Sequence, residues 1–140
     1  MLGRDILTIS FGAVLLAACS SQPEALEVTV QGIEFSFGLA TIEAQVGQEV
    51  TVVLSNVGTV EHDFVILEIP IAQVAEEATE MAGHNMGAAG MEPDIHMAAM
   101  PGLNAHVTFT PTESGTYEFY CAIPGHREAG MVGTLIVVQR

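Results

Sequence analysis

Cys121, His126 and Met131 stand at intervals of five residues near the C-terminus of this 140-residue chain. A thiolate, an imidazole and a thioether form a soft donor set of the kind that binds copper. Pro124 and Gly125, between the first two donors, are typical turn residues and can bring the imidazole back towards the sulfur. The spacing therefore predicts a metal-binding loop in which Met131 is the last donor.

A second imidazole is needed to complete the set of two His, one Cys and a weak axial Met that is typical of blue copper sites. His62 is the best candidate, because it opens a predicted strand and shares one side of that strand with Phe64 and Ile66. Its ring can then point inward at one end of a sheet. The alternatives are that His62 is an ordinary polar residue, Met131 a core residue and Cys121 a small buried hydrophobic residue.

Eight short runs of residues, separated by turn residues, predict the β-strands that must position these donors. They are Glu27 to Val30, Glu34 to Phe37, Thr41 to Val46, Glu49 to Asn56, Asp63 to Ile69, Ala105 to Thr110, Thr116 to Cys121 and Gly133 to Val138. In the seventh run, alternation places Tyr117, Phe119 and Cys121 on one face, so the thiol points into the protein. Strands at this spacing predict an all-β sandwich.

The segment between the His62 strand and the strand near Ala105 breaks this pattern. Ile71 to Met81 predicts a short helix, because it contains good helix formers and apolar residues at helical spacing. We interpret Ala82 to Pro101, which is rich in Gly, Met and Ala, as a flexible loop. His106, at the start of the next strand, is expected to be structural.

The same segment contains a second set of soft donors. They are Met81, His84, Met86, Met91, His96, Met97 and Met100. Such a Met/His cluster could hold an additional, labile Cu(I) ion. The alternative is a loop whose methionines cover apolar surface.

The N-terminus has the layout of an export signal, with Arg4, an apolar run from Ile6 to Leu16 and then small residues. The apolar run is too short for a membrane-spanning helix, which needs roughly 20 residues. Residues 16 to 20, Leu-Ala-Ala-Cys-Ser, resemble a bacterial lipoprotein signal, in which Cys19 becomes the lipidated first residue. We therefore expect a signal peptide at 1–18, a lipidated Cys19 with a tether at 19–26, and one domain at 27–140.

Length and charge limit the classes of function. A chain of 140 residues has room for one domain. It has no lysine and only three arginines against 17 acidic residues, which gives a net charge of −14. Such a surface would repel nucleic acid and favours basic protein partners, although the charge can also serve solubility alone. We expect a monomer.

The residues around the donors resemble those of the cupredoxins, the blue copper proteins that include azurin, plastocyanin and auracyanin. Cys-x4-His-x4-Met is preceded by Gly-Thr-Tyr-Glu-Phe-Tyr and followed by Val-Gly-Thr-Leu-Ile-Val, and the likeness extends over about Glu27 to Val138. It implies a Greek-key β-sandwich of about seven to eight strands, here with one short helix and the Met/His-rich loop. It also implies that His62, Cys121, His126 and Met131 bind one type 1 copper. Asp63 stands where the family usually has an Asn whose amide stabilises the ligand loop.

The resemblance implies a copper electron-transfer protein that cycles between Cu(I) and Cu(II) and is not an enzyme. Multicopper oxidases and nitrite reductases place histidines beside the Cys, but Tyr120 and Ala122 stand there. A redox partner is expected, for example a basic c-type cytochrome or a membrane oxidase or reductase. An export signal and a lipid anchor place the protein on the outer face of the cytoplasmic membrane, in the periplasm or at the cell surface. The alternative function is copper storage or delivery through the cupredoxin site or the loop Met81 to Met100.

Overall fold

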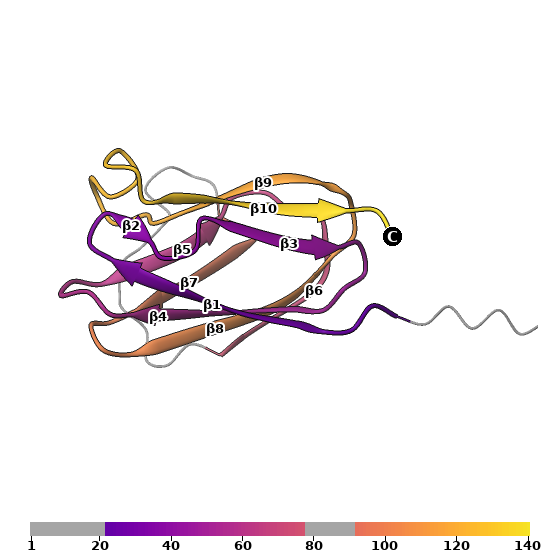
Figure 1. Cartoon of the computed structure of the whole chain (residues 1–140), viewed down its shortest axis with the longest axis horizontal. Coiled ribbons are helices and arrows are strands. Elements are labelled where there is room, and N and C mark those ends of the chain that lie inside the picture. Colours follow the sequence, from indigo (N-terminus) through magenta and orange to yellow (C-terminus); the bar gives the residue numbers. More distant parts are fainter. Residues whose placement is uncertain (1–21, 78–91) are drawn as a thin grey trace, which may run out of the picture.

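The computed structural model describes residues 22–77 and 92–140. These residues form two five-stranded β-sheets that pack face to face (Figure 1). The strands of the described residues are β1 (Leu26–Ile33), β2 (Ser36–Phe37), β3 (Thr41–Gln45), β4 (Val50–Asn56), β5 (His62–Ile66), β6 (Ile71–Glu77), β7 (Ile95–Ala99), β8 (Asn104–Pro111), β9 (Gly115–Tyr120) and β10 (Val132–Val138). One sheet has the order β2-β1-β4-β8-β6, and the other has the order β3-β10-β9-β5-β7. The predicted all-β sandwich is confirmed.

Strand pairing brings the ends of β5, β7, β9 and β10 together at one end of the second sheet. Tyr120, the last residue of β9, pairs with Val132 at the start of β10 and also with Val65 of β5. His62 at the start of β5 pairs with Ala99 at the end of β7. The loop that follows β9 therefore lies beside the first residue of β5.

The core lies between the sheets and is built by strand alternation. Val50, Val52 and Leu54 of β4 are fully buried, while the residues between them are partly exposed. From the other sheet, the ring of Phe64 stacks on that of Phe119, with centroids 4.7 Å apart. Each buried side chain of this size contributes roughly 1.5–3 kcal/mol to folding. The aromatic pair thus supports the strands that carry His62 and Cys121.

The predicted helix over Ile71 to Met81 is wrong for the part that the structure describes. Residues 71–77 form β6, an edge strand that pairs antiparallel with β8. A register shift sets Ile71 opposite Pro111 and Val74 opposite Phe109, so three steps along β6 match two along β8. This bulge gives the apolar residues of a strand the spacing expected of a helix. Residues 78–81 lie outside the described part.

The interpretation of Ala82 to Pro101 as a flexible loop is wrong for β7. Residues 95–99 form this strand, which pairs with β5 over its whole length. Ile95, Met97 and Ala99 are buried, and His96 and Ala98 between them are only partly buried. Alanine, which is depleted in strands, fills the last two positions, so the pairing partner rather than local propensity determines this element.

The predicted signal peptide and Cys19 lie outside the described residues, so the expected division at 1–18, 19–26 and 27–140 stays a prediction. Within the described residues, no helix is long and apolar enough to cross a membrane.

Candidate metal centre

Three of the predicted donors come together at the end of the sandwich where β5 begins and β9 ends. His62, Cys121 and His126 each offer one ligand atom, and these atoms all lie within 4.8 Å of one another. His62 and Cys121 are fully buried, and His126 is 6% exposed. His62 is the first residue of β5, Cys121 directly follows β9, and His126 lies in the β9–β10 loop. The inward orientation predicted for His62 and Cys121 is confirmed.

Backbone hydrogen bonds close the β9–β10 loop and bring its donors together. The Cys121 N–H donates to the Met131 carbonyl at 3.1 Å, and the Met131 N–H donates to the His126 carbonyl at 2.9 Å. The His126 N–H donates to the Ile123 carbonyl at 3.0 Å. Gly125 adopts a φ of 85°, in the left-handed region that the turn needs. Met131 is fully buried at the point where the loop enters β10.

The thiol of Cys121 is held by two nitrogens in a closed environment. The Asp63 N–H donates to its sulfur at 3.3 Å, and Nδ1 of His126 lies 3.4 Å from it. Burial raises the pKa of the thiol, while the N–H groups of Asp63 and Ile123 act in the opposite direction. The free protein therefore holds a protonated thiol, and a soft cation would be required to convert it to a thiolate at neutral pH.

The hydrogen-bonding capacity of the His62 imidazole is not met by the described residues. Both ring nitrogens are buried, and neither has a hydrogen-bond partner within residues 22–77 and 92–140. Burial lowers the pKa of this ring, and the neighbouring His126 lowers it further. The two ring centroids are 5.2 Å apart. Buried nitrogens without partners are costly, and a neutral imidazole beside a thiol and a second imidazole fits a copper ion well.

These pKa shifts predict a pH window for the stability of the metal-free protein. His62 has a folded pKa below its ordinary 6.5, so the unfolded chain gains a proton first as the pH falls below about 6.5. Cys121 has a folded pKa above its ordinary 9.0, so the unfolded chain loses a proton first as the pH rises past about 9. We expect the unfolding free energy contributed by these groups to be lost outside this range. Urea titrations of the metal-free protein from pH 5 to 10 test this expectation, and His62→Gln should remove the loss on the acid side.

Asn56, at the end of β4, holds the β4–β5 loop in place and was not predicted as part of the site. Its side-chain amide donates to the carbonyls of Val60 and Ala99, both at 2.7 Å, and its oxygen accepts from the Gly58 N–H at 2.9 Å. Its position within a strand pattern carried no signal of this role. The amide fixes the approach of the chain to His62.

Asp63, which stands in the position usually occupied by Asn, is fully buried beside the donors. Its backbone, rather than its side chain, holds the Cys121 sulfur. Its carboxylate lies 3.9 Å from Nε2 of His96 on the adjacent strand β7. The carboxylate disfavours a thiolate at Cys121 and favours a charged imidazole at His62. It thus brings negative charge close to the site.

Phe35 covers the ring of His126 from the β1–β2 turn. The two ring centroids are 5.1 Å apart in an edge-to-face arrangement. Phe35 is 53% exposed and has a φ of 61°, a conformation that costs a non-glycine residue roughly 1–2 kcal/mol. The sequence contained no signal of this contact.

The second set of soft donors is only partly described. Met81, His84, Met86 and Met91 lie outside the described residues, so a site formed with them stays a prediction. Of the other members, Met97 is buried in the core, and Met100 is 45% exposed. His96 and Met97 are consecutive on β7, so their side chains lie on opposite faces of the sheet.

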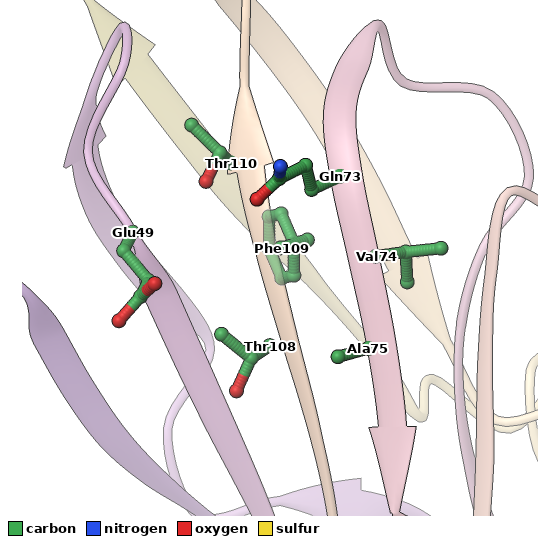
Figure 2. A pocket seen from close by; sticks show the side chains of 7 residues that line it. All are labelled: Glu49, Gln73, Val74, Ala75, Thr108, Phe109 and Thr110. Carbon is green, nitrogen blue, oxygen red and sulfur yellow. The ribbon is translucent and has the colours of Figure 1, made fainter.

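A surface pocket of about 330 Å³ lies away from the donors, across β4, β8 and β6 (Figure 2). Its lining residues are Glu49, Gln73, Val74, Ala75, Thr108, Phe109 and Thr110. It brings together no set of metal donors, so we assign it no part in the centre.

A buried set of His, Cys and His donors beside a buried Met, at one end of a two-sheet sandwich, defines a copper protein of the cupredoxin class. Residues 24–138 match the family model described as copper binding proteins, plastocyanin/azurin family. The chain belongs to this family, whose cofactor is copper.

Curated relatives carry two kinds of name. The chain is 35% identical to the copper-resistant cuproprotein CopI of Rubrivivax gelatinosus over 72% of its own length, and it spans only 59% of that relative. It is 31% identical to the protein of the same name from Pseudomonas aeruginosa, over 91% of this chain and 82% of the relative. It is 29% identical to auracyanin-A of Chloroflexus aurantiacus, over 89% of this chain and 90% of the relative.

The fold agrees with that of solved auracyanins. The reduced auracyanin of Roseiflexus castenholzii superposes with a TM-score of 0.64 at 22% identity, over 83% of this chain and 99% of that structure. The expected cupredoxin fold is therefore confirmed.

Proposed function

We propose that this protein is a type 1 copper electron carrier whose metal is held by His62, Cys121, His126 and Met131. The observation that carries the proposal is the convergence of three buried donor atoms within 4.8 Å of one another, beside a fully buried Met131. Copper bound there would exchange single electrons between Cu(I) and Cu(II). Because all four positions are filled by protein side chains, no position is left for a substrate, and the role is transfer rather than catalysis.

The protein contributes a donor set that is fixed before the metal binds. The backbone bonds among Cys121, His126 and Met131 hold three donors in one closed loop, and the stacked pair of Phe64 and Phe119 supports the strands behind them. Donors held by these bonds would need little rearrangement when the charge of the bound ion changes. Burial excludes water from the sulfur, which protects it from oxidation.

An apolar surface surrounds the end of the molecule that holds the donors. It is made by large exposed apolar side chains at the end of β1 and in the β1–β2 turn, the β4–β5 loop and the β7–β8 turn: Ile33, Phe35, Val57, Val60, Met100 and Leu103. We propose that a redox partner docks here, with His126 behind Phe35 as the electron route. Basic partners, such as a c-type cytochrome or a membrane oxidase or reductase, would be favoured by the net charge of −14.

We propose further that the protein is exported and attached to a membrane surface through a lipidated Cys19. The apolar run of residues 6–16 and the Leu-Ala-Ala-Cys-Ser sequence support this. Mass spectrometry of the mature protein is the direct measurement. An N-terminus at Cys19 carrying acyl chains is the expected result, and a mature protein that retains residues 1–18 would contradict it.

Copper handling is a second candidate function. The similarity to two proteins named copper-resistant cuproprotein CopI favours it. In this role the protein would store or deliver copper through the cupredoxin site, through the loop Met81 to Met100, or through both. It predicts more than one Cu(I) bound per chain and transfer of copper to an acceptor.

An absorption spectrum and a metal analysis of the copper-loaded protein, followed by voltammetry, separate the two candidates. The electron carrier predicts an intense visible band from thiolate-to-copper charge transfer, one tightly held copper and a reversible one-electron wave. If the band is absent, the proposed site is wrong. Additional Cu(I) that is lost to a chelator would favour storage or delivery.

Asp63→Asn tests the effect of the buried carboxylate on the redox balance. The substitution keeps the size of the side chain and the backbone N–H that bonds Cys121. Removing a negative charge beside the donors should disfavour Cu(II) relative to Cu(I). We expect the reduction potential to rise by about 60 mV, the value of a tenfold change for a one-electron couple. Voltammetry of the variant measures this, and an unchanged or lower potential would contradict it.

A further inference from the structure

We propose that Glu34 is a positioning residue for the His62 imidazole, holding the ring by its Nε2 side so that Nδ1 faces the metal. The inference rests on the proposed copper site and assigns it a residue outside the four donors. Glu34 is in the tight turn between β1 and β2, where Ile33 pairs with Ser36, and it is exposed to solvent. It is far from His62 in sequence, and only the fold brings the two together.

The first observation is that the side chains of Glu34 and His62 both lie close to Gly58. A Cβ added to Gly58 would lie 2.8 Å from Nε2 of His62 and 3.0 Å from Oε1 of Glu34. The two polar atoms therefore both lie close to the space that a side chain at Gly58 would fill. Gly58 does not adopt a left-handed φ. A glycine is therefore needed here because a side chain would not fit, and not because of the backbone conformation.

A second glycine fixes which edge of the imidazole faces the turn. A Cβ added to Gly32 would lie 3.0 Å from Cδ2 of His62. Cδ2 and Nε2 are neighbours on the ring, so this edge faces Gly32 and Gly58. Nδ1 is on the opposite edge, which leaves it as the nitrogen available to a metal.

The carboxylate of Glu34 is itself held in place. Its Oε1 accepts hydrogen bonds from the N–H of Thr59 at 2.5 Å and from the Thr59 hydroxyl at 2.8 Å. These bonds lower the pKa of Glu34, and the nearby His62 contributes in the same direction. An ionised carboxylate is therefore fixed across the loop that leads into β5.

Metal-binding histidines generally need such a partner for the nitrogen that does not bind the metal. That partner fixes the tautomer and the ring orientation, and its loss typically costs 10- to 100-fold in metal affinity. Nε2 of His62 is buried and has no hydrogen-bond partner among the residues that the structure describes. The carboxylate of Glu34 is the acceptor that the structure places beside it, within reach of a small loop movement or one bridging water.

Glu34→Gln tests the proposal, with Glu27→Gln as the matched control. Both are exposed glutamates, but Glu27 lies at the opposite end of β1. We expect Glu34→Gln to weaken Cu(II) binding about tenfold relative to Cu(I), which raises the reduction potential by about 59 mV for a one-electron couple. The control should leave the potential of the parent protein unchanged.

A second measurement requires no copper, which keeps this proposal separable from the proposed function. At a fixed pH of about 8, where imidazole is normally neutral, ring 15N shifts of the metal-free protein report the tautomer of His62. We expect the Nε2–H tautomer in the parent protein and in Glu27→Gln, and a mixture in Glu34→Gln. The Nδ1–H tautomer in the parent protein, or a Glu34→Gln variant that matches the control in tautomer or in potential, overturns the proposal. A missing visible band in the parent protein instead overturns the copper site.

Discussion

Cys121→Ser should abolish the intense visible absorption of the copper-loaded protein and weaken copper binding at least 100-fold. The thiolate is the only anionic and the softest member of the proposed donor set, and a serine hydroxyl does not replace it at neutral pH. The fold should survive. The Asp63 N–H and the His126 ring, which contact the sulfur, can both hydrogen-bond to a hydroxyl instead.

A second sulfur in the core provides the matched control for this experiment. Met97 is buried among apolar side chains, and Met97→Leu is close to volume-conserving. We expect this variant to keep the visible band and the copper stoichiometry. Absorption spectra, metal analysis and competition with a Cu(I) chelator measure the differences. A band that persists in Cys121→Ser would show that another sulfur binds the copper.

Gly133→Ala should be the most destabilising single methyl addition in the described part of the chain. A Cβ at this position would lie 2.1 Å from Cζ of Phe119, which is fully buried and stacked on Phe64. The ring has no free space to move into, because protein cores are close-packed. We expect a loss of about 3 kcal/mol or more in the free energy of unfolding, measured by urea denaturation.

A double-mutant cycle distinguishes this clash from a general loss of glycine. Phe119→Leu shortens the side chain that the new methyl group would meet, so the double variant should be more stable than the sum of the single effects predicts. Gly38→Ala is the control, because its added Cβ meets only the flexible side chain and backbone of exposed Gln31. A Gly133→Ala variant no less stable than this control would contradict the expected clash.

Most of the fold, and the meeting of Cys121 and His126 with His62, could be predicted from residue types and spacing. Alternation and turn residues predicted eight strands, which correspond to β1 to β5 and β8 to β10. They failed at β6, where a bulge mimics helical spacing, and at β7, where the alanines show little strand preference. In both strands the pairing partner supplies the stabilisation, and a partner distant in sequence leaves no local signal.

The surroundings of the donors were much less predictable than the donors. Glu34 and Phe35 approach the histidines from the β1–β2 turn, and Asn56 at the end of β4 holds the loop that leads to His62. Their side chains have no spacing relative to His62 or His126 that a pattern could detect. Only the pairing of β1 with β4, and of β5 with β7, brings these groups to the same end of the sandwich.

The hydrogen bonds that tie Cys121, His126 and Met131 into one closed loop have a consequence for metal choice. A donor set assembled in advance cannot discriminate between cations by folding around only the correct one. Zinc could also bind the two imidazoles and the Cys121 sulfur after displacing its proton, and it would be redox-silent. The intrinsic affinity order favours Cu(II) over Zn(II) at such ligands. Correct loading therefore depends on this difference in affinity, on which ion reaches the folded chain first and on how slowly an incorrect ion leaves.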